Sequence, residues 1–450
     1  MSPAAAGQKR TVRFFPRQEK TDSPFLAGVG KNGPSIFDKG EKSGQSVFGV
    51  DTALDKARQK RTVRFSLRGK NGLSIFLLGM LLLAGCATAR EAGGGGSAAL
   101  EAFQRGEFDR AEALSRDSRD DDSLLLRANL LLLRNRAREA ANLLSPAATR
   151  VAKTIDDVQV ITRARELLAQ ALLRLDDFNG ASEWFKRLGE TIAARKYEAL
   201  ARSVAYLTEP VGRDITVDLL GANPLPHVSM TVKGRTGIFV IDTSIDEILI
   251  DRDFAERAGL TAFGVRTTSY SAAYNESIAD HLELGNLTIK NVPVHIGKMN
   301  PNARLRAHGA IGLAFLMHFD FTIDYRRSKL VLRPAGGTLS QGLPAVLAGD
   351  RHLLAQGSLN GQPGAWIAIH TALQDVVVAA SESTVNNPSG PVREIAAGSL
   401  RLTNPPLDAS AFPPDLDGAY GFRVGFMLGH DALRDRSIRL EPRSMRMLIE

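Results

Sequence analysis

Residues 237–244 read Gly-Ile-Phe-Val-Ile-Asp-Thr-Ser, so an apolar run ends at an acidic residue, Asp242, that two small hydroxylated residues follow. The run predicts a buried strand. A lone carboxylate at the end of such a strand costs several kcal/mol to bury, unless its pKa shifts until it is neutral. The stretch Asp242-Thr243-Ser244 therefore indicates a site whose chemistry depends on a carboxylate.

A second unit of the same kind follows later in the chain. Residues 360–370 match the predicted hairpin 227–242, but the acidic position is now His370, followed by Thr371 and Ala372. Two further blocks match in the same order: 398–407 with 285–294, and 428–449 with 311–332. Three blocks in one order predict an internal duplication of about 120 residues. Its second copy has lost the carboxylate.

The charge of the chain is concentrated at its beginning. The 450 residues are 44% hydrophobic and 24% charged, which suits a globular protein of two to four domains. The net charge is +8, but residues 1–85 carry +9 and the remainder carries −1. A globular part without excess positive charge argues against a nucleic-acid partner.

The basic segment ends in a targeting signal. Basic residues between 61 and 70 precede the apolar stretch 73–85, which is too short to span a membrane but suits a signal peptide, predicted over 68–85. Residues 83–86 read Leu-Ala-Gly-Cys and resemble a bacterial lipobox, which implies a lipid anchor on Cys86, the single cysteine. Ala87 after it implies, by the same resemblance, an outer-membrane protein that faces the periplasm. A plain secretory signal or a buried helix is the alternative.

Residues 1–67 contain copies of later segments: 8–14 recurs as 59–65, and 30–37 recurs as 69–76. Few apolar residues and scattered glycine, proline and lysine predict a disordered leader, or a start site assigned too early. We assign this leader no function.

After a glycine-rich tether over 86–97, residues 98–206 have a helical pattern. Phe108 and Phe178 lie 70 residues apart, as do Ala111 and Ala181, which is two periods of 35. This resembles tetratricopeptide repeats, helical hairpins of about 34 residues, and implies a peptide or protein ligand. A plain amphipathic bundle is the alternative.

From Thr208 the pattern changes to short alternating strands separated by turn residues. Residues 239–244, with the later pair Ile311-Gly312, resemble the retropepsin-like aspartyl peptidases. The resemblance covers roughly 212–335 and, more faintly, 343–450. It implies two lobes, each supplying one aspartate, whose carboxylates lie about 3 Å apart, share a proton and activate a bridging water.

The resemblance also implies roles for individual residues. Asp242 is the first catalytic aspartate, Thr243 braces its loop, and Ser244 replaces the usual glycine. His370 stands where the second aspartate belongs, and an ion pair of His370 with Asp242 cannot share a proton as two carboxylates do. The remaining assignments are Thr371 behind His370, Tyr270 or Tyr274 as flap residues, and Ile311, Gly312, Leu428 and Gly429 as the elements that brace the two loops.

The fold class expected is therefore multidomain: an all-α region of helical-hairpin repeats, then mainly-β tandem retropepsin- or pepsin-like lobes. The function expected is that of an envelope lipoprotein of the aspartyl peptidase family that hydrolyses peptide bonds with Asp242. One alternative is an inactive module that binds a peptide or envelope protein through the cleft and the repeats; another is a purely structural envelope protein. The eight histidines show no metal-ligand spacing, so neither a metal nor a cofactor is expected. The sequence leaves the oligomeric state open.

Overall fold

The computed structural model describes residues 94–450, except for 222–223, 268–272, 300–304, 386–389 and 414–415. The chain divides into two units, Met1–Thr62 and Val63–Glu450, and every described residue belongs to the second. The predicted leader, the signal peptide and Cys86 lie outside the described residues. Within the described part, none of the helices combines the length and apolarity that crossing a bilayer requires.

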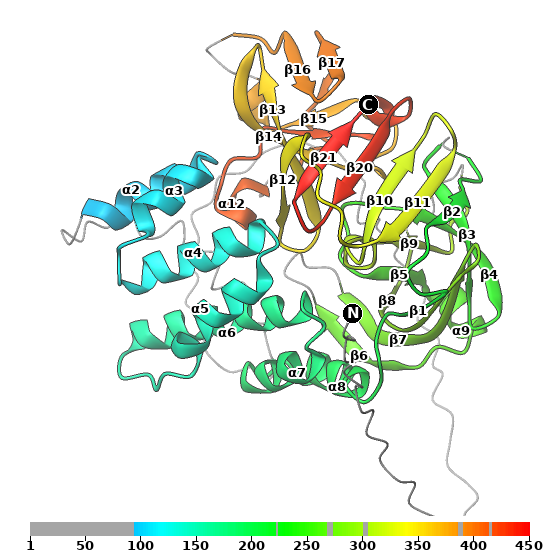
Figure 1. Cartoon of the computed structure of the whole chain (residues 1–450), viewed down its shortest axis with the longest axis horizontal. Helices are drawn as coiled ribbons and strands as arrows, with labels where there is room; N and C mark the ends of the chain where they lie inside the picture. Colours follow the sequence, from blue (N-terminus) through cyan, green and yellow to red (C-terminus); the bar gives the residue numbers. More distant parts are fainter. Residues whose placement is uncertain (1–93, 222–223, 268–272, 300–304, 386–389, 414–415) are drawn as a thin grey trace, which may run out of the picture. The chain divides into compact units, whose positions relative to one another are not determined.

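The described part begins with helices, which we call the helical arm (residues 94–200; Figure 1). Both α3 and α7 begin at the predicted aromatic positions, Phe108 and Phe178, and bury Ala111 and Ala181 completely. Such small buried residues let helices approach closely. The helices are α2 (Gly94–Gln104), α3 (Phe108–Ser115), α4 (Asp121–Leu133), α5 (Ala137–Ala148), α6 (Ile155–Leu173), α7 (Phe178–Arg187) and α8 (Thr191–Leu200).

The first helix begins at Gly94, so residues 94–97, which were predicted to belong to the tether, are helical. Glycine is a poor helix former in a helix interior, but the first turn has unpaired N–H groups in any case, so glycine is tolerated better there. The glycine-rich composition of residues 94–97 predicted a tether where a helix in fact begins.

The first β region, lobe 1, carries the motif strand β4 in an eight-stranded sheet of order β1-β8-β5-β9-β4-β3-β7-β6. Its elements are β1 (Leu207–Glu209), β2 (Ile215–Asp218), β3 (His227–Val232), β4 (Arg235–Ile241), β5 (Ile248–Asp251), α9 (Arg252–Arg257), β6 (Ala262–Thr267), β7 (Ala273–Leu284), β8 (Leu287–Gly297), β9 (Gly309–Ile311), α10 (Leu313–Leu316), β10 (Phe319–Asp324) and β11 (Lys329–Pro334).

Lobe 2 follows with the same succession of hairpin, motif loop, short brace strand, short helix and closing hairpin. Its elements are β12 (Leu343–Ala348), β13 (His352–Leu359), β14 (Gln362–Ile369), β15 (Val378–Ala380), α11 (Glu382–Val385), β16 (Glu394–Ala397), β17 (Leu400–Thr403), β18 (Leu407–Asp408), α12 (Leu416–Tyr420), β19 (Phe426–Leu428), α13 (His430–Leu433), β20 (Ser437–Glu441) and β21 (Arg446–Ile449).

The two lobes share one sheet. This sheet has 13 strands, of which β2, β10 and β11 come from lobe 1 and the others from lobe 2. Around the junction the order is β12-β21-β20-β10-β11-β2, and β10 pairs with β20. That pairing is antiparallel and sets Phe321 opposite Leu440 and Ile323 opposite Ile438, all buried. One apolar core therefore runs through both lobes, which fixes their relative orientation.

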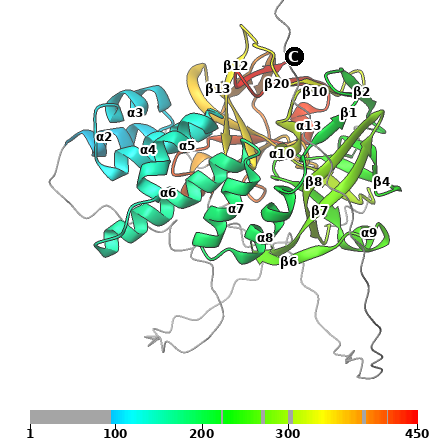
Figure 2. The same ribbon diagram turned by 60° about the horizontal axis from the view of Figure 1, so that its bottom comes forward.

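The helical arm packs against both lobes. At lobe 2, Phe108 stacks on Trp366 of β14 with ring centroids 4.9 Å apart, and Trp366 Nε1 donates to the Gly106 carbonyl at 2.9 Å. At lobe 1, α8 lies along β6 and contacts β7 and β8, as Figure 2 shows. The lobe 2 contact falls close to the motif loop of that lobe, since Trp366 lies on β14, which leads directly into His370.

Candidate active site between the lobes

Each motif residue follows a strand that is braced from one side by a parallel partner. Asp242 comes after β4, which pairs with β9, and its N–H donates to the Ile311 carbonyl at 3.0 Å. His370 comes after β14, which pairs with β19, and its N–H donates to the Leu428 carbonyl at 3.0 Å. The two brace segments thus hold the two loops by equivalent backbone bonds.

Both brace glycines are required by close packing. A Cβ on Gly312 would lie 2.3 Å from the Asp246 carbonyl oxygen, and one on Gly429 would lie 2.2 Å from the Val376 carbonyl oxygen. Carbon and oxygen do not approach so closely, and a backbone carbonyl cannot move aside as a flexible side chain can. Glycine therefore lets each brace lie directly against the loop that it supports.

Thr243 and Thr371 join the lobes by reciprocal hydrogen bonds, which we call the threonine lock. Thr243 Oγ1 donates to the Ile369 carbonyl at 2.5 Å, and Thr371 Oγ1 donates to the Ile241 carbonyl at 2.6 Å. Each hydroxyl also accepts the other threonine's backbone N–H, at 3.1 and 3.2 Å. Both side chains are buried, so the lock holds the two motif loops against each other without water.

The lock brings Asp242 and His370 together at the interface. His370 Nε2 lies 3.7 Å from Asp242 Oδ1, and each side chain keeps a small exposed fraction, 18% and 16% respectively. Ser244 lies between them: its Oγ is 2.6 Å from Asp242 Oδ1 and 2.7 Å from His370 Nε2. The Ser244 N–H also donates to Asp242 Oδ1 at 2.8 Å.

Proton counting decides the direction of this chain of bonds. A serine hydroxyl has one proton, so it can donate either to the carboxylate or to the imidazole. If His370 Nε2 accepted that proton, Ser244 Oγ and Asp242 Oδ1 would face each other at 2.6 Å as two acceptors. The consistent arrangement has His370 Nε2–H donating to Ser244 and Ser244 Oγ–H donating to Asp242.

The imidazole is neutral at neutral pH. Burial lowers the pKa of His370 below its ordinary value, against the opposing effect of the Asp242 carboxylate and with the help of the Arg351 guanidinium. The expected ion pair is therefore confined to acid solution. The other ring nitrogen, Nδ1, lies 3.2 Å from the Met427 sulfur; with the proton on Nε2 both atoms are acceptors, so this contact is not a hydrogen bond.

The flap region is described only in its two strands. Residues 268–272 between β6 and β7, including Tyr270, lie outside the described residues. Tyr274 is described on β7, where its ring stacks on His295 with centroids 5.1 Å apart. Its ring therefore belongs to a charged cluster on lobe 1 that the sequence analysis did not predict.

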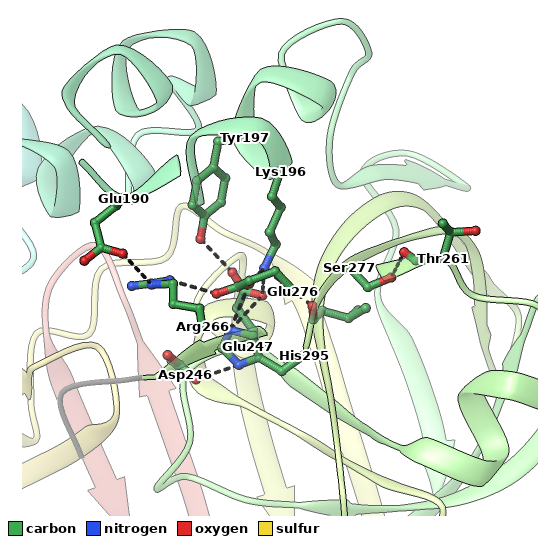
Figure 3. A network of polar contacts seen from close by, with 11 residues as sticks. Glu190, Lys196, Tyr197, Asp246, Glu247, Thr261, Arg266, Glu276, Ser277 and His295 are labelled. Carbon is green, nitrogen blue, oxygen red and sulfur yellow. Dashed lines mark hydrogen bonds and ion pairs between the residues drawn. The ribbon is translucent and has the colours of Figure 1, made fainter. Parts of the chain in front are cut away.

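This cluster, which we call the charge cluster, connects the arm with lobe 1 (Figure 3). Lys196 of α8 is fully buried, and its ammonium group bonds to the carboxylates of Glu247 and Glu276. His295 Nε2 lies 3.3 Å from Glu276 and 3.5 Å from Glu247, and Arg266 Nη1 donates to Glu276 at 2.8 Å. Three basic side chains thus surround two buried carboxylates.

The charges in the cluster support one another. Burial alone would lower the pKa of His295, but the carboxylates of Glu247, Asp246 and Glu276 outweigh it and raise the pKa to about 10. Burial would raise the pKa of Glu276, but Lys196, followed by His295 and Arg266, holds it well below its usual range. His295 and Glu276 are therefore ionised at neutral pH, and each depends on its neighbours to be so.

Glu247, Glu276 and His295 also have the spacing of a metal site, since one ligand atom from each lies within 4.8 Å of the others. The Lys196 ammonium already bonds to both carboxylates. A cation is therefore present without a metal ion, and the geometry gives no reason to place one there.

A cavity of about 360 Å³ lies between the arm and both lobes. It is lined by Arg174 and Tyr197 from the arm, by Asp246 of the motif loop, and by Arg351 and Tyr420 from lobe 2. Its size is that of a small-ligand pocket. The cavity reaches the motif loop at Asp246 and Glu247, but Asp242, Ser244 and His370 do not line it.

The comparison with known protein families agrees with this description of lobe 1. Residues 228–315 match the family described as aspartyl protease. Among solved structures, a retropepsin-like aspartic protease from Rickettsia conorii is similar over 98% of its own chain and 30% of this one, with 18% identity and a TM-score of 0.23. No curated protein sequence matched. The family match supports a peptidase-family protein that carries an aspartyl protease-like domain.

Proposed function

We propose that this chain is an aspartyl protease-like module that holds an extended peptide between its lobes and does not cleave it efficiently at neutral pH. The observation that carries the proposal is the bond chain from His370 through Ser244 to Asp242. A peptidase of this type needs a second carboxylate and a bridging water. Here an imidazole replaces the carboxylate, and a serine hydroxyl bridges the two groups.

The electrostatics support the same proposal. With a neutral imidazole in place of a second carboxyl group, the site lacks the acid that would protonate a leaving amine. Ser244 donates its one proton to Asp242, so it is not poised as a nucleophile either. The intact threonine lock and both braces keep the architecture that positions a peptide.

Hydrolysis in acid solution is the second candidate, and one observation favours it. Asp242 and His370 both keep some exposure at the interface. Below the pKa of His370 the imidazolium would be an acid beside the Asp242 carboxyl group, so cleavage by this pair would be restricted to acid solution.

Fluorescein-labelled casein, an unfolded protein, tests the non-hydrolytic proposal on the full chain. We expect the wild type to bind labelled casein and to leave it intact at pH 7, while the double variant Ser244→Gly/His370→Asp cleaves it in acid. Asp242→Ala placed on that double variant is the matched control and should abolish cleavage. Rapid cleavage by the wild type at pH 7, lost in Asp242→Ala, would show that the non-hydrolytic proposal is wrong.

We also propose that the module is a lipoprotein anchored through Cys86 in the outer membrane, with the arm and lobes in the periplasm. The supporting features are the basic segment, the short apolar stretch and the Leu-Ala-Gly-Cys sequence at 83–86. Metabolic labelling with a fatty acid should label the wild type and not Cys86→Ser. Equal labelling of both proteins would exclude this anchor.

A further inference from the structure

The charge cluster places a fully buried lysine from the helical arm inside lobe 1. Lys196 has no exposed surface, and its ammonium group also approaches the Val294 carbonyl at 3.5 Å. Burying a lysine is costly unless its charge is compensated in place. Here the compensation comes entirely from another part of the chain, since Glu247 and Glu276 lie 51 and 80 residues later.

The two carboxylates lie on two different segments of lobe 1, the motif loop and β7. Glu247 ends the loop that begins at Asp242, just before β5, and Tyr197 of the arm donates to the same carboxylate at 2.9 Å. Glu276 lies on β7, the second flap strand. One ammonium group therefore joins the motif loop and the flap strand to α8.

Other arm residues hold the first flap strand. Arg195 Nη2 donates to the Phe263 carbonyl on β6 at 3.1 Å, and Glu190 lies 3.7 Å from Arg266. Gly264 packs so closely on Ile192 that an added Cβ would approach it to 3.1 Å. Both flap strands are thus fixed to the arm, close to Lys196.

We propose that Lys196 is a positioning residue for the inter-lobe site. From the arm it holds the Asp242 loop through Glu247 and flap strand β7 through Glu276, so that arm docking sets the geometry in which a ligand is held. The identity of the ligand rests on the peptide-holding function proposed above, whereas the predicted effect of Lys196 on the geometry of the site does not. The arm then acts as a third part of the site and not only as a separate binding surface.

Two measurements on the full chain test it: the affinity for labelled casein, and the titration midpoint of His370 followed by NMR of histidine-labelled protein. Lys196→Met should weaken casein binding roughly tenfold and shift the His370 midpoint by about half a pH unit. Lys186→Met is the matched control, because Lys186 lies on α7 and is 44% exposed with only surface partners. The control should change neither quantity.

A lower unfolding midpoint with an unchanged His370 titration would mean that Lys196 only stabilises the fold, and would overturn the proposal. If the wild type fails to bind casein but Lys196→Met still shifts the titration, the proposed ligand is wrong and the positioning role stands. If Lys196→Met does not fold, Glu247→Gln keeps the Lys196–Glu276 pair and should produce the same shift. An unchanged titration in Glu247→Gln would also refute the role.

Chemical rescue gives an independent check. Removing the side chain with Lys196→Ala leaves Glu247, Glu276 and His295 with metal-ligand spacing. Zn²⁺ alone should then bind this variant and return the His370 midpoint toward the wild-type value, but should have no effect on the wild type. Zinc binding without recovery of the midpoint would show that the cation at this position does not act on the motif loop.

Discussion

The threonine lock makes the sharpest prediction about how the two lobes are held together. Thr243→Val keeps the shape of the side chain but removes its hydroxyl. The Thr371 N–H then loses its acceptor, and the Ile369 carbonyl loses a donor at 2.5 Å. An orphaned buried donor costs about 1–3 kcal/mol and a lost hydrogen bond about 1 kcal/mol, so the free energy of unfolding should fall by about 2–4 kcal/mol.

Thr371→Val should cost a similar amount, because its bonds to Ile241 and to the Thr243 N–H mirror those of Thr243. The double variant should cost about 1–2 kcal/mol less than the sum of the single variants, since the same interface is broken by either one. Urea unfolding followed by circular dichroism measures all three. Thr216→Val, at an exposed position on β2, is the control and should stay within about 0.5 kcal/mol of the wild type.

A cost below about 0.5 kcal/mol for Thr243→Val would refute this reasoning. Strict additivity of the two single variants would do the same, because it would mean that the hydroxyls act independently. Either result would remove the lock as the link between the motif loops.

Three further predictions follow from the packing and charges. Gly312→Ala and Gly429→Ala should each destabilise the protein by several kcal/mol, because the added Cβ atoms would meet backbone carbonyls. Gly418→Ala is the control, since its Cβ would meet nothing within 4 Å, and thermal unfolding compares the three variants. The pKa of His295 is raised to about 10, so the stabilisation that it contributes is complete below its ordinary pKa of about 6.5 and is lost as pH rises toward 10. Urea unfolding at pH 7 and pH 9.5 should therefore show that the free energy of unfolding falls by up to about 1.4 kcal/mol per pH unit, and His295→Gln should not show this loss. Trp366→Ala should lower the free energy of unfolding by about 3 kcal/mol and speed amide hydrogen exchange in α2 and α3, because it removes their aromatic contact with lobe 2. Unchanged exchange in these helices would contradict the role of Trp366 in holding the arm on lobe 2.

Local order explains why the sequence could predict the pairing of Asp242 with His370. Each strand, motif loop and brace lies within one short block, and the blocks occur twice in the same order. The motif strand and brace strand run parallel in both lobes, and the two side chains meet at 3.7 Å. Patterns confined to one short block can be recognised in the sequence without knowledge of the tertiary packing.

The role of Ser244 could not be predicted in the same way. In the sequence it is a small residue in place of a glycine, and its effect depends on where its hydroxyl points. That direction is set by the turn after Asp242 and by an imidazole 126 residues away. Only the assembled interface shows that the hydroxyl bridges the two groups.

The charge cluster was missed because its members look like ordinary surface charges. Helical spacing gave one usable signal: Ala193, Lys196, Tyr197 and Leu200 recur at three- and four-residue intervals and are all buried, so the lysine lies on the buried face of α8. A lysine on that face requires acidic partners. The sequence could have indicated that partners exist, but not that they lie on the motif loop and the flap strand.

The threonine lock and the braces can stay in place while the side chain at position 370 changes. The threonine lock bonds only to backbone groups and to the other threonine, so it does not depend on which side chain occupies position 370. The same holds for the braces, which bond through backbone amides. An imidazole can therefore replace a carboxylate while the cleft keeps its geometry, provided that its hydrogen-bonding capacity is met.

Ser244 meets that requirement, and this links the two departures from the family pattern. With glycine at 244, the Nε2–H of a part-buried His370 would lose its hydroxyl partner at 2.7 Å, and Asp242 would lose one of two bonds to Oδ1. With aspartate at 370, the Ser244 hydroxyl would lie between two carboxylates that a water must bridge. Each single reversion therefore leaves hydrogen-bonding groups without suitable partners, so Ser244→Gly and His370→Asp should restore cleavage only together.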